Sequence, residues 1–350
     1  MNTYIIYHGT GCSDGLTSAA IFNYWINKND FQHKEKYHFI AGHFQMTIQD
    51  LPDLSNSIVY FLDFSFKKDL FKYVLDTASQ TFLIDHHKSA YDELEEFIKQ
   101  PTKYNLYTSF NLNECGSSLT WMYLFPNTPL PLIIKHIKDR DIWIWKEQNS
   151  KEYLAYLDLI PLNLKSYTEH YQMVLNLPSA DFFLYYQKAI ELGTILMKQK
   201  ANLVQPSIDN IRYYSLLNFC NLFGIPYTDI LNHANTDKTT DIDTLICKVE
   251  GLGISNCPSV FVNDVSEAVV DNGNSDLLIG YNFSQDGIRF SIRSSKYINS
   301  ISIAKLINDK AGGHVQSSGA FVNWHDWDNI HVEQKTPLYR MLNMYVYMYL

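Results

Sequence analysis

Short apolar runs alternate with segments of helical spacing along the first hundred residues. Three runs, rich in β-branched and aromatic residues, predict buried strands at residues 4–7, 57–62 and 81–84. Apolar positions three and four apart follow the first two runs and predict helices at residues 16–26 and 66–78. Strands that alternate with helices indicate an α/β fold, in which helices cover both faces of a parallel sheet.

The same patterns divide the chain into parts. A long periodic segment, Ser179–Gln205, predicts a helix that ends before Pro206. The stretch from Asn210 to about Pro258 is interpreted as an elaborated start of a second, smaller α/β domain. We expect four parts: a first domain over 1–178, a linker helix over 179–209, the smaller domain over 210–335 and a C-terminal tail over 336–350. The apolar tail is too short to span a membrane and is expected to pack onto the protein or onto a second copy in a homodimer.

Length and charge restrict the classes of partner. At 350 residues, 46% of them hydrophobic, the chain is long enough for two well-packed domains. The formal net charge of −9 argues against a protein that coats long duplex nucleic acid. It allows a small anionic substrate that is held by metal ions and a few basic residues.

Cysteine usage and the N-terminal residues indicate a compartment. The five cysteines have neither the number nor the spacing of a disulfide framework or a zinc ribbon. The chain begins with a strand-like run and without a charged, cleavable leader, and no apolar stretch is long enough to cross a membrane. These features predict a cytoplasmic protein with no membrane partner.

Polar side chains of the metal-binding type follow each of the three predicted strands. The ligands of proteins with parallel sheets bind at the carboxyl ends of the strands, where these residues should meet. Each residue alone could be a helix cap or a turn residue, but together they suit a divalent ion such as manganese. Two such ions roughly 3.5–4 Å apart can activate water for attack on phosphorus. The residues are His8 and Asp14 after the first strand, Asp63 after the second, and Asp85, His86 and His87 after the third.

These residues resemble the motifs of the DHH phosphoesterases, a family named for the triplet that stands here as Asp85-His86-His87. The resemblance covers nearly the whole chain. Within the family, the chain looks like a subgroup whose first motif also carries Cys-x-Asp-Gly. The fourth motif is an aspartate that here must come from Lys138–Trp143; we favour Asp139 by its distance from the following aromatic residue, with Asp141 as its rival. The resemblance implies two divalent ions and these metal ligands: His8, Cys12, Asp14, Asp63, His86 and Asp139.

Cys12 is the main departure from the family, which usually has an aspartate at this position. Three outcomes are open, in order of preference. The centre could hold two ions with a sulfur ligand, which would shift its preference from manganese towards zinc or iron. One ion could bind weakly, or Cys12 could pack beneath the loop without touching a metal.

A second set of motifs lies in the C-terminal part. In the predicted strand 288–294, Arg289 and Arg293 alternate and therefore share a face. Residues 311–319, AGGHVQSSG, resemble the GGGH-x-x-A-A-G loop of the DHH-associated domain, with one glycine fewer and serines for the alanines. The resemblance implies that a phosphate or nucleotide end is bound by Arg289, Arg293, Gly312, Gly313 and His314.

The resemblance also implies roles in the reaction. Asp63 would bridge the two ions, and His87 would face the substrate phosphate as a charge stabiliser or proton donor. Asp85 would orient a histidine that binds metal. The expected activity is hydrolysis of a phosphodiester or phosphoanhydride in a short nucleotide-type substrate, such as an oligonucleotide, a dinucleotide, phosphoadenosine phosphate or polyphosphate. The alternative is a binding or sensor protein in which Cys12 has weakened catalysis.

Overall fold

The computed structural model describes residues 1–9, 11–214, 220, 227–230, 252–258, 261–308 and 311–325. The chain divides into two compact units, Met1–Lys198 and Gln199–Leu350. The predicted C-terminal tail and much of the predicted start of the second domain, residues 231–251, lie outside the described residues. Among the described residues, no helix combines the length and the apolar character needed to cross a membrane.

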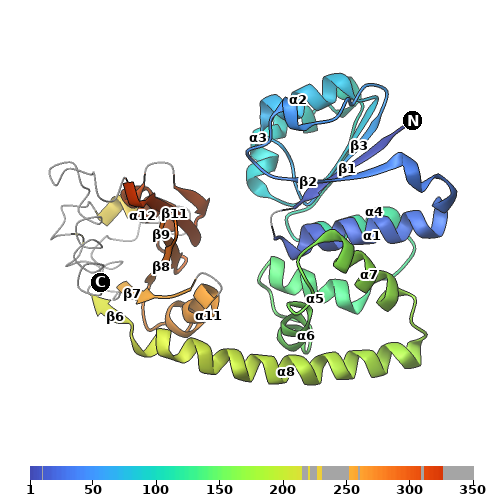
Figure 1. Ribbon diagram of the computed structural model, residues 1–350. Coiled ribbons are helices and arrows are strands. Elements are labelled where there is room, and N and C mark those ends of the chain that lie inside the picture. The colour runs from blue at the N-terminus through green and yellow to red at the C-terminus, as the bar shows by residue number, and fades with distance from the viewer. Residues whose placement is uncertain are drawn as a thin grey trace. The chain divides into compact units, whose positions relative to one another are not determined.

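The first unit is built on a parallel five-stranded sheet, as the sequence predicted (Figure 1). The strand order is β2-β1-β3-β4-β5. Strand β2 therefore lies on one side of β1, and β3, β4 and β5 follow in order on the other side. The three predicted strands are confirmed as β1, β3 and β4. The bounds are β1 Thr3–His8, β2 Tyr37–Gly42, β3 Ile58–Leu62, β4 Gln80–Asp85 and β5 Leu106–Phe110.

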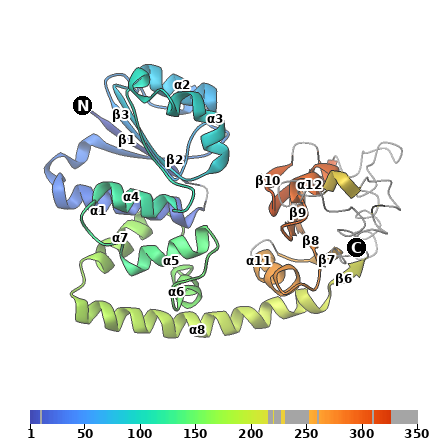
Figure 2. The same ribbon diagram turned by 180° about the vertical axis from the view of Figure 1, so that it is seen from behind.

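Helices cover both faces of this sheet. Successive strand residues point to opposite faces, so Ile5 belongs to one core and its neighbour Ile6 to the other. Helices α2 and α3 pack on the side of Ile6, and α1 and α4 on the side of Ile5 (Figures 1 and 2). The bounds are α1 Ser13–Asn29, α2 Lys68–Thr77, α3 Lys88–Ile98 and α4 Gly116–Leu124, with short 3-10 turns η1 Phe31–Lys36, η2 Ile48–Asp50 and η3 Pro101–Tyr104.

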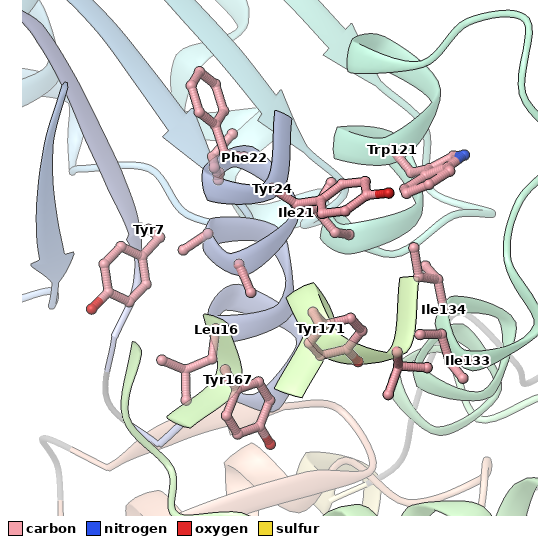
Figure 3. Close-up of a cluster of buried hydrophobic side chains, with 14 of the residues drawn as sticks. Tyr7, Leu16, Ile21, Phe22, Tyr24, Trp121, Ile133, Ile134, Tyr167 and Tyr171 are labelled. Carbon is pink, nitrogen blue, oxygen red and sulfur yellow. The ribbon is translucent and has the colours of Figure 1, made fainter. Parts of the chain in front are cut away.

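A second layer of helices covers α1 and α4. Their shared core is rich in tyrosine, and Figure 3 shows Tyr167 and Tyr171 of α7 beside Leu16 of α1. The Thr17 hydroxyl donates to the Tyr171 hydroxyl at 3.1 Å, which satisfies a polar group inside this core. The bounds are α5 Leu132–Asp141, α6 Ser150–Leu157, α7 Leu164–Leu175 and α8 Ser179–Asp209.

Helix α8 has the bounds predicted for the linker helix, 179–209. The periodic pattern alone predicted an end at Gln205, but the helix continues through Pro206 to Asp209. Pro206 has no amide to donate to the preceding turn, and its carbonyl accepts the Asn210 amide at 3.2 Å. The division between the two units falls inside α8: Ala189 packs in the core of the first unit and Val204 in a core of the second.

The second unit contains a mixed sheet in the order β10-β11-β9-β8-β7-β6, in which only β7 and β8 pair in parallel. Helix α12 packs on one face, against Ile288, Phe290 and Ile292 of β9. The bounds are β6 Arg212–Tyr214, η4 Tyr227–Ile230, β7 Leu252–Asn256, α11 Val262–Ser266, η6 Glu267–Asp271, β8 Leu277–Ser284, β9 Gly287–Ser294, α12 Ser300–Ile307, β10 Gly312–His314 and β11 Ser317–Asn323.

The predicted glycine loop of the second unit is a strand. Gly312–His314 form the edge strand β10, which pairs antiparallel with β11, so that His314 lies opposite Ser317. Gly313 has φ 142°, and a Cβ there would lie 2.6 Å from the Ser317 carbonyl oxygen. Glycine at position 313 is therefore required by the close approach of the two strands, and the binding of a phosphate at Gly312 and Gly313 stays a prediction.

Candidate metal centre

The ends of the parallel strands bring the predicted ligands together. His8 ends β1, Asp63 follows β3, and Asp85 ends β4. The donor atoms form three overlapping groups, and within each group all atoms lie within 4.8 Å of one another. The groups are His8, Cys12 and Asp63; Asp14, His86 and Asp141; and Asp63, Asp85, His86 and His87.

Asp63 lies at the centre of this arrangement and is 1% exposed. Its Oδ2 is 3.4 Å from Cys12 Sγ and 3.6 Å from His8 Nδ1, whereas its Oδ1 is 3.1 Å from His86 Nε2. Burial raises the pKa of Asp63, but the nearby imidazole of His8 and the hydrogen bond to His86 outweigh burial and hold it well below its usual range. The two oxygens of one ionised carboxylate therefore face two different donor groups.

The backbone is fitted closely around these side chains. Asp63 has φ 54°, a left-handed conformation that aspartate tolerates better than most residues. A Cβ at Gly116 would lie 2.3 Å from Asp63 Cβ, and a Cβ at Gly15 would lie 2.3 Å from the His8 carbonyl oxygen. The two glycines allow α4 and α1 to approach the centre, a role that the sequence analysis missed.

Asp14 is held by the N-terminus of α4. Its Oδ2 accepts the Gly116 amide at 2.6 Å and its Oδ1 accepts the Ser117 amide at 3.0 Å. Burial and the negative charges of Asp63 and Asp141 raise the pKa of Asp14. These amide donors were not predicted from the sequence. The small residues that begin the apolar segment at Gly116 are the signal that could have indicated them.

His86 joins the two sides of the centre. Its Nε2 lies 3.1 Å from Asp63 Oδ1 and 3.3 Å from Asp141 Oδ2. Burial lowers the pKa of His86, but the bond to Asp63 and the neighbouring carboxylates raise it to about 9. In the metal-free chain His86 is thus a cation among carboxylates, a position that a divalent ion could take over.

Asp141, and not the favoured Asp139, belongs to this group of donors. The side chain of Asp141 is 25% exposed, and burial and the charge of Asp63 raise its pKa to about 6. Asp139 is fully enclosed elsewhere: its Oδ2 accepts the Glu147 amide at 2.7 Å and the Ser150 hydroxyl at 2.5 Å. The choice by distance from the aromatic residue failed because the segment is helical through Asp141, so that Asp139 points to the other side.

Asp139 belongs to a buried hydrogen-bond chain. Ser150 donates to Asp139, so its hydroxyl oxygen accepts from His136 Nδ1 at 2.8 Å. His136 Nε2 then accepts from the Tyr186 hydroxyl at 2.8 Å, which requires a neutral imidazole. Burial lowers the pKa of His136 to about 4, in agreement with that form. The chain joins the segment after Asp141 to helix α8.

Asp85 contacts His87 and not the ring of His86. Its Oδ1 lies 2.7 Å from His87 Nδ1 and accepts the backbone amides of both histidines. Burial lowers the pKa of His87, but the hydrogen bond to Asp85 outweighs burial and raises it. Asp85 thus orients the histidine that was expected to face the substrate, and not the one expected to bind metal.

Cys12 occupies the N-cap of α1. Its Sγ accepts the Gly15 amide at 3.4 Å and donates to Asp63 Oδ2 at 3.4 Å. Burial and the negative charge of Asp63 raise its pKa, so the thiol keeps its proton in the metal-free chain. Sγ lies within 4.8 Å of donor atoms of His8 and Asp63, and its role as a metal ligand stays a prediction.

The second unit presents the predicted basic residues on one face of its sheet. Arg289 and Arg293 of β9 point away from α12, as alternation required. His314, Ser317 and Arg293 lie opposite one another on three adjacent strands and so form a polar row. Arg293 Nε donates to Asn263 Oδ1 at 3.0 Å. Arg289 lies over the ring of Phe321, 5.4 Å from its centroid.

Comparisons with known proteins add relatives but no family assignment. No protein-family model matches the sequence. An uncharacterised protein of Acanthamoeba polyphaga mimivirus, R106, is 33% identical over 158 residues, which are 43% of this chain and 36% of R106. The match thus spans little more than a third of that relative.

Solved structures give low similarity over most of the chain. A pGpG-specific phosphodiesterase of Vibrio cholerae, PggH, has 11% identity and a TM-score of 0.44, with 98% of each chain covered. An exopolyphosphatase-related protein of Bacteroides fragilis has 12% identity and a TM-score of 0.41, covering 98% of this chain and 92% of that one. RecJ of Thermus thermophilus, in complex with Mn2+, has 12% identity and a TM-score of 0.42, covering 99% of this chain and 52% of RecJ. Values this low establish neither a common fold nor an activity for this chain.

Proposed function

We propose that this protein is a metal-dependent phosphoesterase of the DHH type. The observation that carries the proposal is the position of Asp63, whose two carboxylate oxygens face separate groups of nitrogen, oxygen and sulfur donors. A carboxylate between two such groups is the arrangement expected of a bridging ligand in a two-metal centre. The Asp85-His86-His87 motif at the end of β4 supports the same reading.

The donor set fits two divalent ions. His8, Cys12 and Asp63 would hold one ion, and Asp14, His86 and Asp141 would hold the other, with Asp63 shared. When bound, two such ions activate a water molecule and stabilise the charge that develops at phosphorus. Carboxylate and imidazole ligands suit manganese, and the sulfur of Cys12 opens the first group to zinc or iron.

His87 is the proposed proton donor. It lies at the edge of the centre, with Nδ1 4.0 Å from Asp63 Oδ1 and 2.7 Å from Asp85 Oδ1. Asp85 fixes the ring and favours its protonated form, so His87 can give a proton to the leaving oxygen of a phosphoester or stabilise charge there. His86, between two carboxylates, is the proposed ligand.

The polar row of the second unit is the proposed binding surface for the rest of the substrate. Arg289, Arg293 and His314 lie on one sheet face, and guanidinium groups suit two-pronged bonds to phosphate oxygens. Three basic residues suit a short nucleotide, such as an oligonucleotide end or a dinucleotide, better than a long duplex. The cytoplasm stays the proposed location, because the five cysteines have neither the number nor the spacing of a disulfide framework.

A substrate panel tests the proposal. Metal-free protein and protein supplied with manganese are incubated with short RNA and DNA oligomers, linear and cyclic dinucleotides, phosphoadenosine phosphate and polyphosphate. Hydrolysis of at least one phosphodiester or phosphoanhydride should require metal, and Asp63→Ala should abolish it together with metal binding. Tyr107→Phe, a change on the exposed β5 edge, is the matched control and should behave as the unmodified protein. Metal-independent hydrolysis, or near-normal turnover by Asp63→Ala, would contradict the proposal.

A binding or sensor protein is the second candidate, because Cys12 stands where most of the family has an aspartate. It would bind the same nucleotides without turnover and would contain one metal equivalent or none. Two equivalents of bound metal with turnover would exclude it.

A further inference from the structure

The two sides of the metal centre differ in donor chemistry. The first group offers His8 Nδ1, Cys12 Sγ and Asp63 Oδ2, a set with one imidazole, one sulfur and one carboxylate. The second offers His86 Nε2 with carboxylates of Asp14 and Asp141, and Asp63 Oδ1 also faces it. Thiolates favour zinc and ferrous iron, whereas a set rich in carboxylate oxygens suits manganese or magnesium.

The separations of the donor atoms are compatible with metal ions in both groups. Four-coordinate zinc, with bonds of about 2.0–2.3 Å, places its ligand atoms about 3.3–3.8 Å apart. In the first group, Asp63 Oδ2 lies 3.4 Å from Cys12 Sγ and 3.6 Å from His8 Nδ1. A six-coordinate ion with bonds of about 2.0–2.1 Å brings neighbouring ligand atoms to about 2.9–3.0 Å. His86 Nε2 lies 3.1 Å from Asp63 Oδ1 and 3.3 Å from Asp141 Oδ2, so both groups have spacings in reach of a metal ion, and the donor chemistry distinguishes the two groups.

His8 gives an independent sign that the first group receives a ligand. Its Nδ1 is buried and has no hydrogen-bond partner among the residues that the structure describes. A buried imidazole nitrogen normally finds a partner. Nδ1 points towards the carboxylate oxygen of Asp63 across 3.6 Å, too far for a hydrogen bond and suitable for an ion between the two atoms.

We propose that the centre is mixed, with a thiophilic ion such as Zn2+ at His8, Cys12 and Asp63 and a harder ion such as Mn2+ at Asp14, His86 and Asp141. The inference rests on the metal centre of the proposed function and adds which kind of ion each group of donors binds. On binding of the thiophilic ion the S–H bond of Cys12 breaks, a sulfur–metal bond forms and the proton passes to the buffer. The α1 N-terminus, which donates the Gly15 amide to Sγ, stabilises the resulting thiolate.

Competition between the two metals tests this inference. Metal-free full-length protein is dialysed against excess Mn2+ in a chelator-buffered series of Zn2+ concentrations, and both metals are counted by mass spectrometry. The unmodified protein should take up one zinc at low zinc levels and keep one manganese. Cys12→Asp should need at least tenfold more zinc to do so and should otherwise hold two manganese ions. Cys115→Ser is the control, because this buried thiol belongs to none of the donor groups found among the described residues.

Cobalt provides a direct view of the sulfur ligand. Co2+ added alone should produce the intense near-ultraviolet band of a cobalt–thiolate bond in the unmodified protein and in Cys115→Ser, but not in Cys12→Asp or Cys12→Ser. Thermal unfolding of each variant shows that it is folded. Absence of the band, or equal zinc uptake with and without Cys12, would overturn the inference.

Neither measurement depends on turnover. A hydrolase that holds two manganese ions and shows no cobalt–thiolate band would sink the mixed centre and leave the proposed function standing. A mixed centre in a protein that hydrolyses nothing would do the opposite.

Discussion

Asp139 and Asp141 lie two residues apart at the end of α5, and their carboxylates contact different parts of the protein. Asp141 Oδ2 is 3.3 Å from His86 Nε2, within the candidate metal centre. Asp139 binds the Glu147 amide and the Ser150 hydroxyl, and its carbonyl oxygen accepts the Ile144 amide at 3.0 Å. Asp139 thus holds the segment after Asp141 in place through hydrogen bonds. In this segment Trp143 and Trp145 take left-handed backbone conformations, which cost free energy.

The two aspartates should therefore respond differently to substitution. Asp141→Asn should lower metal content, with little change in the stability of the metal-free protein, because it removes a partly exposed ligand. Asp139→Ala should lower the free energy of unfolding by roughly 2–3 kcal/mol, because two buried donors lose a charged acceptor. Metal analysis and urea unfolding measure both effects. Metal loss in Asp139→Asn, which keeps an acceptor oxygen, would contradict this division.

His86 and His87 should separate metal binding from proton transfer. His86→Ala should lose metal, whereas His87→Ala should keep it and lose rate. If His87 acts as an acid, kcat/KM falls as the pH rises through its pKa, which Asp85 holds above the usual range. Asp85→Asn should move this falling limb to lower pH at unchanged metal content. A pH profile that Asp85→Asn leaves in place would remove His87 from this role.

The stability of the metal-free protein should depend on pH through His86. Its folded-state pKa of about 9 lies above the value of about 6.5 expected in the unfolded chain. The stabilisation is therefore complete below pH of about 6.5 and is lost as the pH rises through about 9. The Tm of metal-free protein should fall across this range, and His86→Gln should weaken the dependence. Scanning calorimetry checks both, and a flat profile for the unmodified metal-free protein would speak against this charge state.

Gly116 should be needed for the position of Asp63. A Cβ at Gly116 would lie 2.3 Å from Asp63 Cβ, whereas a Cβ at Gly312 meets no atom within 4 Å. Gly116→Ala should therefore displace Asp63 or α4 and lower metal content severalfold or more, and Gly312→Ala should leave metal content unchanged. Analysis of the bound metal in the two folded variants measures this difference. Full metal occupancy in Gly116→Ala would contradict the need for glycine at this position.

The sequence predicted the central strands because they are buried on both faces and read as apolar runs. The edge strands β2 and β5 were missed, since each exposes several residues and carries no continuous apolar run. The ligands at the strand ends could be predicted because a parallel sheet places the carboxyl ends of its strands at one edge.

Other parts of the site depend on contacts between segments far apart in the chain. Asp14 meets the amides of Gly116 and Ser117, about a hundred residues later, and no local pattern encodes that pairing. The choice between Asp139 and Asp141 depended on where α5 ends, and helix ends are the least predictable part of an element. The interpretation of Gly312–His314 as a loop failed because pairing with β11 turns a glycine-rich segment into an edge strand.

Arg293 should contribute to binding and not to the metal centre. It lies in the second unit, in a row with Ser317 and His314, and Asn263 fixes its guanidinium at 3.0 Å. Arg293→Ala should raise KM for nucleotide substrates by about ten- to a hundredfold, since hydrogen bonds to charged groups contribute about 1.5–3 kcal/mol. Metal content should not change. Lys305→Ala removes one exposed charge from α12, on the opposite face of the sheet, and should leave KM unchanged.

The size of the substrate separates binding by this surface from a loss of stability. Bis-p-nitrophenyl phosphate carries one phosphodiester and no further phosphate for Arg293 to hold, so its hydrolysis should hardly change in Arg293→Ala. Kinetics of both substrates, with the Tm of each variant, measure the contrast. If Arg293 only stabilised the sheet through Asn263, the Tm should fall and both substrates should suffer equally. Equal loss on the large and the small substrate would therefore exclude a binding role for the polar row of the second unit.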